Sequence, residues 1–242
     1  MRKKNKIKIV VTGGSGRFGK VLKNIRNPYD VYFPKKKELD ILDLQSIKKT
    51  LKKINPKYLI HLAGLSRPLL LHENKINRSI DLNIIGTCNI TKACAEKNIK
   101  LIYFSTSYVY PGTKGNYMES DSLLPVNNYA WSKLGGECAV QLYKNSLILR
   151  LCMTEKPFVH KAAFCDAKNS FMYHDEVAKI LLKLLNEKGI LNVGGKIQSI
   201  YNFAKIENPK IKKIFSKKNK SIKILTNTSV NTEKMKKVLK NK

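Results

Sequence analysis

The stretch that decides the fold is VTGGSGRFGK, residues 11–20, which follows the apolar run IKIV at residues 7–10. Three of its four glycines, Gly13, Gly16 and Gly19, are spaced three residues apart. In a strand–turn–helix unit, the first glycine permits a tight turn, the second lets a pyrophosphate approach the main chain, and the third lets the helix pack on the strand. The start of the helix then offers N–H groups to the phosphates. The spacing alone also fits a glycine-rich surface turn, so the neighbouring elements decide.

Strand-like and helix-like segments alternate along most of the chain. Strand-like runs are expected at 7–12, 29–33, 39–41, 58–62, 101–106, 146–151 and 190–193. Helical patterns are expected at 17–25, 45–53, 74–97, 129–144, 175–185 and 232–240. Such alternation is typical of βαβ units, in which helices cover both faces of a parallel sheet. The expected fold class is therefore α/β, a Rossmann-like doubly wound parallel sheet, with ligands bound beyond the carboxyl ends of its strands.

The end of the second strand-like run bears on the choice of dinucleotide. An acidic residue there suits the ribose 2′-hydroxyl of NAD, whereas a basic group suits the 2′-phosphate of NADP. The chain has YFPKKKELD at residues 32–40, with Lys35, Lys36 and Lys37 at the relevant place. These lysines favour NADP(H). NAD(H) stays open, because in so basic a chain they also fit an ordinary solvated charge run.

A tyrosine and a lysine in NNYAWSKLGGE, residues 127–137, indicate proton chemistry. Tyr129 and Lys133 are four residues apart and share one face of a helix. An ammonium beside a phenol lowers the phenol pKa, so that the tyrosine exchanges protons near neutrality. Gly135 and Gly136 are costly inside a helix, which predicts that another part of the protein or a ligand approaches closely. Upstream, Thr106 ends a strand-like run, where its hydroxyl is placed to bond a substrate oxygen.

The chain is strongly basic, with 47 Lys and Arg against 17 Asp and Glu and a formal charge of +30. The lysines are spread along the chain and do not interleave with aromatic residues, as a base-stacking platform would require. We therefore expect no specific nucleic-acid partner, but attraction for anionic small molecules such as phosphates. No apolar run is long enough for a membrane span, and the basic residues 1–6 do not open a secretory signal.

The five cysteines show neither the spacing of a zinc site nor that of a redox motif. We expect five reduced thiols, no metal and a cytoplasmic location. The oligomeric state is open, with a homodimer as one option.

Together these motifs resemble the extended short-chain dehydrogenase/reductases that act on nucleotide sugars, and within them the dTDP-4-dehydrorhamnose reductase family most. The resemblance rests on TGGSGRFG, ELDILD, HLAGLSRP, DLNIIGTCNI, FSTSYVYPGTKGNYMESDSLLPVNNYAWSKLGGE and LILRL, which fall between residues 7 and 151. A weaker likeness continues through YHDEVAKILLKLL, ILNVGG and TSVNTEKMKKVL. Two departures stand out. Ser107 follows the threonine where the family often has an acid, and only about 20 residues separate LILRL from YHDEVA.

The resemblance implies a set of functional residues. The catalytic set would be Thr106, Tyr129 and Lys133. The cofactor would contact Gly13, Gly16, Arg17, Phe18, Gly19, Lys35, Asp43, Leu44, Leu62, Ala63, Gly64, Asn83, Ser105, Tyr129 and Lys133. Among these, Asp43 and Leu44 would border the adenine, and Asn83 would lie on the long helix near the active site.

The resemblance also implies a reaction and a division of the chain. Hydride would pass from NAD(P)H to a carbonyl of a nucleotide-linked 4-keto-6-deoxy sugar, with Tyr129 as proton donor, Lys133 lowering its pKa and Thr106 bonding the carbonyl oxygen. Residues 1–151 would form a dinucleotide-binding Rossmann domain. Residues 152–242 would form a small, shortened C-terminal substrate-binding region, part of which, at about 174–195, would return to the main domain.

Two other functions stay open at this point. An epimerase or dehydratase of nucleotide sugars has the same fold but retains its NAD. A dinucleotide-binding scaffold without catalysis would fit the shortened C-terminal region.

Overall fold

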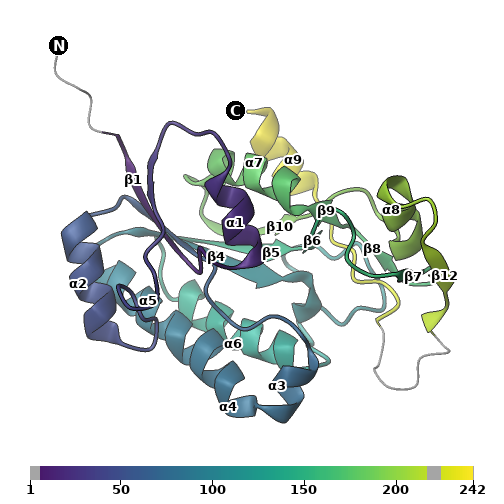
Figure 1. Cartoon of the computed structure of the whole chain (residues 1–242), viewed down its shortest axis with the longest axis horizontal. Helices are drawn as coiled ribbons and strands as arrows, with labels where there is room; N and C mark the ends of the chain where they lie inside the picture. The colour runs from purple at the N-terminus through teal and green to yellow at the C-terminus, as the bar shows by residue number, and fades with distance from the viewer. Residues whose placement is uncertain (1–5, 217–224, 242) are drawn as a thin grey trace.

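The computed structural model describes residues 6–216 and 225–241, and shows a layered α/β molecule (Figure 1). The basic residues 1–5 and the lysines of 217–220 lie outside the described residues. The main sheet has six strands, all paired in parallel. Across the sheet they are β2 (Asp30–Tyr32), β1 (Lys8–Thr12), β3 (Tyr58–His61), β4 (Lys100–Thr106), β5 (Ser146–Leu151) and β10 (Gly189–Val193). The chain order reverses at β1, which lies between β2 and β3 and so defines a ligand-binding crevice at its carboxyl end.

The sheet is covered on both faces because its central strands are apolar on both sides. Side chains alternate along a strand, so Ile9 and Val11 pack on one face while Val10 packs on the other. The first face is covered by α1 (Arg17–Lys23), α7 (His174–Leu184) and α9 (Glu233–Lys240). The second is covered by α2 (Leu44–Ile54), α5 (Gly86–Glu96) and α6 (Asn128–Gln141). Every residue of β4 and β5 is buried, which places these two strands at the centre of the core.

The long helix predicted over 74–97 is present but divided. It consists of α4 (Ile76–Ser79), a π-helical segment η1 (Ile80–Ile85) and α5, preceded by the short α3 (Leu70–Asn74). A π-helical turn is wider than an α-helical one, and such turns occur frequently at functional sites. In this chain the π-helical segment carries Asn83.

The strand predicted at residues 39–41 is wrong, because the structure has turns and irregular backbone there. Leu39 and Ile41 are nonetheless buried, 6% exposed each, and pack with Ile47 and Leu51 of α2. The apolar–polar–apolar pattern of residues 39–41 resembles that of a strand. Here it reflects two apolar side chains of a turn, Leu39 and Ile41, that are buried against α2. That turn is closed by hydrogen bonds from the N–H groups of Glu38 and Leu39 to the carbonyl of Lys35.

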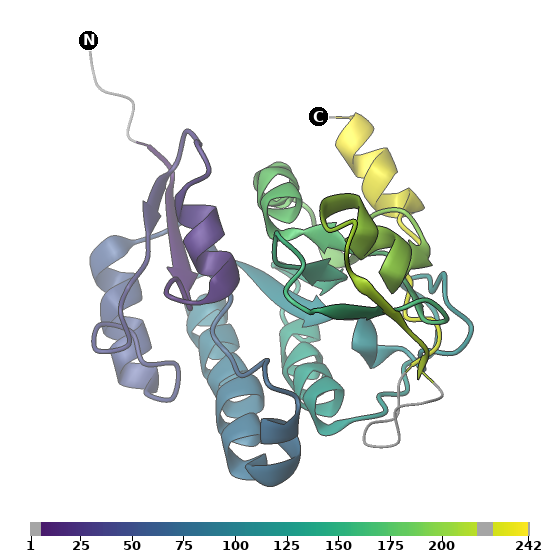
Figure 2. The same ribbon diagram turned by 45° about the vertical axis from the view of Figure 1, so that its right-hand side comes forward.

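Short elements after β5 form a second, smaller layer (Figure 2). β6 (Met153–Thr154) pairs with β9 (Met172–Tyr173), β7 (Ala162–Phe164) with β12 (Lys212–Ile214), and β8 (Lys168–Asn169) with β11 (Gln198–Ser199). The helix α8 (Ile200–Glu207) covers them, and Phe158, Tyr173 and Phe203 form their apolar cluster. Both views place α8 on the side of the molecule away from α2.

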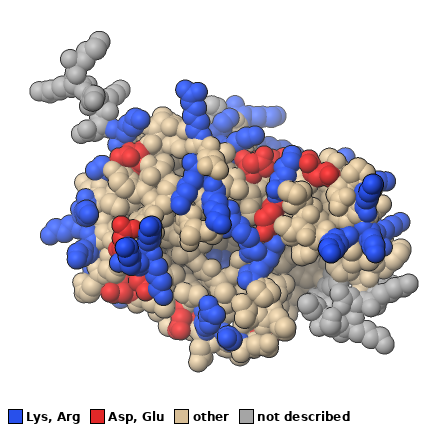
Figure 3. All heavy atoms as spheres, viewed as in Figure 1, with Lys and Arg blue, Asp and Glu red and all other residues tan. Residues whose placement is uncertain are grey.

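Basic side chains are dispersed over the surface. Figure 3 shows Lys and Arg scattered over one face, with few Asp and Glu among them. In the parts of the chain that the structure describes, no helix is long and apolar enough to cross a membrane.

Candidate active site

The glycine loop forms a tight turn held close to the neighbouring strand. Gly13 has φ +69°, which favours glycine, and a Cβ there would lie 2.6 Å from the backbone nitrogen of Ala63. A Cβ on Gly19 would lie 2.7 Å from the carbonyl oxygen of Gly13, so α1 packs directly on the loop. Gly16 donates its N–H to the Gly13 carbonyl at 2.9 Å and precedes the first residue of α1. The strand, turn and helix predicted from VTGGSGRFGK are confirmed.

Asn83 fastens the loop after β3, residues 62–66, to the helix that carries Tyr129. Its Oδ1 accepts from the N–H of Leu65 at 2.7 Å, and its Nδ2 donates to the Leu65 carbonyl at 2.9 Å and to the Ser132 hydroxyl at 2.8 Å. The side chain is buried and these contacts use its amide on both sides. Asn83 therefore acts on the site by holding α6 and this loop together.

The two glycines of α6 allow the π-helical segment to approach. A Cβ on Gly136 would lie 2.5 Å from the carbonyl oxygen of Asn83, and one on Gly135 would lie 2.9 Å from the Cδ1 atom of Ile84. The close approach predicted for this helix is confirmed, and the approaching element is η1.

Thr106 and Tyr129 meet where β4 ends. The Thr106 hydroxyl accepts from the N–H of Tyr108 at 3.3 Å, and its side chain also interacts with the Tyr129 hydroxyl. Burial raises the pKa of Tyr129, while Thr106, Arg67 and Arg17 lower it; the net pKa is above its ordinary value. Tyr129 thus keeps its proton at neutral pH and is suited to donate it.

Lys133 lies one turn further along α6 in a buried position. Burial lowers its pKa to about 7, and Glu137 acts in the opposite direction. Its Nζ lies 4.2 Å from the ring centroid of Tyr103. The expected effect of Lys133 on the pKa of Tyr129 stays a prediction. In this geometry burial lowers the pKa of Lys133 to about 7, and the guanidinium groups of Arg67 and Arg17 lower the pKa of Tyr129.

A buried ion pair between Glu137 and Arg150 joins α6 to β5. Glu137 accepts from the Ser105 hydroxyl at 2.6 Å and from Arg150 Nε at 3.0 Å and Nη2 at 2.5 Å. Arg150 also donates to the Tyr110 hydroxyl at 2.9 Å. The side chain of Ser105, expected at the cofactor, is engaged in this network. Sequence reasoning missed the pair, although a lone arginine inside the apolar strand LILRL was a signal for a buried partner.

A second group, of which the sequence predicted only Arg17, joins the start of α1 to the segment after β6. Arg17 donates to the Ser66 hydroxyl at 2.8 Å and pairs with Glu155 at 3.3 Å. Arg67 pairs with the other carboxylate oxygen of Glu155 at 2.9 Å. We call Arg17, Ser66, Arg67 and Glu155 the arginine cluster. Both guanidinium groups lower the pKa of Tyr129.

Several residues expected at the cofactor use their side chains elsewhere. Phe18 is buried in the core, with its ring 5.0 Å from that of Phe104. Asp43 caps α2 by accepting from the N–H groups of Gln45 and Ser46. Lys35 is exposed beyond β2, on the side of the sheet where the adenosine half of a dinucleotide would lie. Leu62 and Ala63, which directly follow β3, are partly buried, and Gly64 after them is exposed; Leu44, the first residue of α2, is partly buried.

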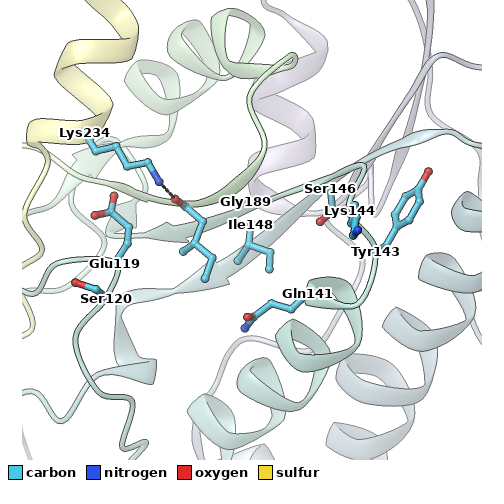
Figure 4. A pocket seen from close by; sticks show the side chains of 10 residues that line it. Glu119, Ser120, Gln141, Tyr143, Lys144, Ser146, Ile148, Gly189 and Lys234 are labelled. Atoms are coloured by element: carbon cyan, nitrogen blue, oxygen red, sulfur yellow. Dashed lines mark hydrogen bonds between the residues drawn. The ribbon is translucent and has the colours of Figure 1, made fainter.

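A cavity of about 440 Å³ lies elsewhere, at the amino ends of β5 and β10 (Figure 4). It is bordered by the outer edge of β10, where Lys234 donates to the Ile190 carbonyl at 2.7 Å and Glu119 accepts from the N–H of Asn192 at 2.9 Å. The residues that line it include none of those expected in the catalytic set. It is therefore separate from the candidate site.

A doubly wound parallel sheet with a glycine loop at the carboxyl end of β1 has the Rossmann-like architecture of the short-chain dehydrogenase/reductases. The model of the RmlD substrate binding domain family matches residues 7–155, and the chain belongs to this family. The resemblance drawn from the sequence, to extended reductases of nucleotide sugars, is thereby confirmed.

Solved structures have the same fold. dTDP-4-dehydrorhamnose reductase from Bacillus anthracis, in complex with NADP, superposes with a TM-score of 0.85 at 23% identity over 96% of this chain and 92% of that chain. WbmG from Bordetella bronchiseptica, in complex with NAD, gives 0.74 at 17% identity over 98% and 88%.

Two kinds of curated relative align with about half of the chain. Methionine adenosyltransferase 2 subunit beta of Pongo abelii is 30% identical over 142 residues, 55% of this chain and 42% of that protein. GDP-6-deoxy-D-talose 4-dehydrogenase of Aggregatibacter actinomycetemcomitans is 32% identical over 147 residues, 57% of this chain and 49% of that protein. The chain thus spans less than half the length of the curated relatives it matches.

Proposed function

We propose that the protein is an NAD(P)H-dependent reductase of a nucleotide-linked 4-keto-6-deoxy sugar. The observation that carries the proposal is the meeting of Thr106 and Tyr129 at the end of β4, with Lys133 on the same helix. Family membership supports it, as does the structural likeness to a reductase solved with NADP. The arginine cluster fits a dinucleotide, because guanidinium groups are suited to bind phosphate oxygens.

The residues divide the chemistry among them. A reduced nicotinamide, when bound, supplies the hydride. Tyr129 gives its proton to the carbonyl oxygen, and Thr106 donates a hydrogen bond to the same oxygen as negative charge develops there. Lys133 then acts as the nearby charge that favours the tyrosinate left behind. The exposed Lys35 would face the 2′-phosphate, so NADP(H) is the favoured cofactor and NAD(H) the alternative.

We also propose a division of labour along the chain. Residues 1–151 would bind the dinucleotide, and residues 152–242 would form a reduced region for the sugar nucleotide. Within the latter, 174–195 would belong to the first part, since β10 pairs with β5 and α7 packs on the same face as α1.

The direct test is the loss of NADPH absorbance with a panel of 4-keto sugar nucleotides. Steady consumption by the wild-type protein is expected, and Tyr129→Phe should reduce turnover by about 10²- to 10⁴-fold while it still binds NADPH. If Tyr129→Phe turned over at the wild-type rate, another group would be the acid. An isomerised sugar without net NADPH loss would instead favour an epimerase, the activity named for a solved structure from Campylobacter jejuni with a TM-score of 0.74.

A role as a subunit without redox activity is the second candidate. It is favoured by the matches to methionine adenosyltransferase 2 subunit beta. NADPH binding together with no turnover on the whole panel would support it.

A further inference from the structure

The arginine cluster spans the carboxyl edge of the sheet. Arg17 follows β1, Ser66 and Arg67 follow β3, and Glu155 follows β5 and β6. In the sheet, β3 and β4 lie between β1 and β5, and neighbouring strands are about 4.8 Å apart. The pair of Arg17 and Glu155 therefore joins segments that follow β1 and β6, on the carboxyl side of the sheet where ligands bind in this fold.

The carboxylate of Glu155 uses the donors that a phosphate would need. One oxygen faces Arg17 Nε at 3.3 Å and the other accepts from Arg67 Nη1 at 2.9 Å, while Arg17 Nη2 is engaged by the Ser66 hydroxyl. Guanidinium groups bind carboxylates and phosphates through the same planar fork of N–H groups. One arginine fork cannot serve both anions fully at once.

Glu155 is a charged carboxylate at neutral pH. Burial raises its pKa, but Arg67 and Arg17, together with a backbone hydrogen bond and His174, lower the pKa below its ordinary value. Its side chain is 18% exposed, and those of Arg17 and Arg67 are 46% and 35% exposed, so the arginines stay accessible to an entering anion.

We infer that Glu155 competes with the pyrophosphate of the dinucleotide for Arg17 and Arg67 and thereby lowers the affinity of the site for its cofactor. The inference rests on the proposed function, since it requires that the crevice bind NAD(P)H. Glu155 is in these terms an affinity-setting residue and takes no part in proton or hydride transfer.

The test compares Glu155→Gln with a matched control. Glu207→Gln removes the same charge from a neighbouring pair, Lys156 with Glu207 at 3.1 Å, which does not involve the arginines. Dissociation constants for NADPH are measured by fluorescence on the full chain, at fixed ionic strength. Glu155→Gln should bind NADPH roughly fivefold more tightly, the factor that corresponds to one partly exposed ion pair, and Glu207→Gln should match the wild type.

A second ligand tests whether the change in affinity of Glu155→Gln depends on the pyrophosphate. Adenosine 2′-monophosphate lacks the pyrophosphate, so its affinity should be equal in the wild type and in Glu155→Gln. Both variants change exposed or partly exposed carboxylates, and their thermal unfolding confirms that they are folded before binding is measured.

The outcomes separate this inference from the proposed function. If the wild type binds NADPH and Glu155→Gln binds it equally or more weakly, the competition is wrong while the proposed function stands. An equal gain for adenosine 2′-monophosphate would also overturn the competition, because the gain would then be a general charge effect. If neither protein binds any dinucleotide, both proposals fail.

Discussion

The imidazole of His72 lies edge-on against the ring of Tyr129, with ring centroids 5.1 Å apart and planes at 65°. His72 is fully buried, and its Nδ1 is hydrogen-bonded to the Ser79 hydroxyl. The ring of Tyr108 also lies edge-on to that of Tyr129, with ring centroids 6.3 Å apart. The phenol that we propose as proton donor is thus oriented by two rings, one from the helix α3 and one from the turn after β4.

Replacement of His72 should therefore affect turnover more than binding. His72→Ala removes the ring and the Ser79 hydrogen bond, and we expect kcat to fall roughly tenfold to a hundredfold because Tyr129 is no longer held in position. His72→Phe removes the same hydrogen bond but keeps a ring, so its kcat should stay near that of the wild type. The measurement is steady-state NADPH oxidation, with KM for NADPH expected to be unchanged. A wild-type kcat in His72→Ala would show that the ring contact does not orient Tyr129.

The pKa of Lys133 predicts a pH dependence. Because burial lowers the pKa of Lys133 to about 7, the ammonium form predominates below that pH and is lost as the pH rises through it. If the charge stabilises the tyrosinate, kcat falls above about pH 7, by up to tenfold per unit. Lys133→Arg stays charged at every pH in the assay, so its kcat, although lower, should be flat over the same range. An identical alkaline decline in both proteins would assign the titration to another group.

A hydrogen-bond chain centred on His61 predicts the acid stability of the fold. The Thr12 hydroxyl accepts from the N–H of Ala63 and lies 2.8 Å from His61 Nδ1, to which it donates when the imidazole proton is on Nε2. The Thr87 hydroxyl donates to the Asn83 carbonyl and so accepts from His61 Nε2, at 3.1 Å. This order requires a neutral imidazole with its proton on Nε2, consistent with a pKa that burial, together with Lys133, lowers to about 3.

Because the folded pKa of His61 is below the unfolded value of 6.5, the unfolded chain binds one more proton between these values, and stability is lost as the pH falls. Between pH 7.5 and 5 this one group removes about 2 kcal/mol from the free energy of unfolding. His61→Gln should be less stable at neutral pH, and its stability should decline less steeply below pH 6.5. Urea unfolding at several pH values measures both slopes. If the free energy of unfolding declined equally steeply with falling pH in the wild type and in His61→Gln, His61 would be protonated in the folded protein.

The buried pair of Glu137 and Arg150 should contribute strongly to the free energy of unfolding, because it joins α6 to β5. Glu137→Gln leaves a buried guanidinium without its counter-charge, and we expect a loss of about 3–5 kcal/mol in the free energy of unfolding. The control is Glu96→Gln, which breaks an exposed pair with Lys48 and should cost at most about 1 kcal/mol. Denaturant unfolding measures both variants. A loss in Glu137→Gln as small as the control would mean that solvent reaches Arg150.

Local patterns account for most of the fold. The strand at 146–151 has the predicted bounds, and the helix that carries Tyr129 begins at Asn128, where the Asn127 side chain accepts from the N–H of Ala130. Each of these features depends on residues close together in the chain. The run 39–41 shows the opposite case, since two apolar residues separated by a polar one fit a strand and a buried turn equally well, and only their packing against α2 decides.

The parts of the site that could not be predicted depend on contacts between distant residues. Arg67 and Glu155 are 88 residues apart, and nothing in SRP or in MTEKP marks either one as the partner of the other. The raised pKa of Tyr129 likewise follows from burial, which depends on the whole fold. The spacing of Tyr129 and Lys133 predicted that both lie on one helix, and the surrounding packing determines which cations act on the pKa of Tyr129.

The side chains that cover the outer edge of β10 bear on how the protein behaves at high concentration. An uncovered edge strand offers its N–H and carbonyl groups to another chain, which is a common start of strand-mediated aggregation. Lys234 and Glu119 already satisfy an outward carbonyl and an outward N–H of β10, and they place one charge of each sign beside that strand. Growth of the sheet by a second molecule is thus blocked at this end, and β2, with only three residues, offers little template at the other.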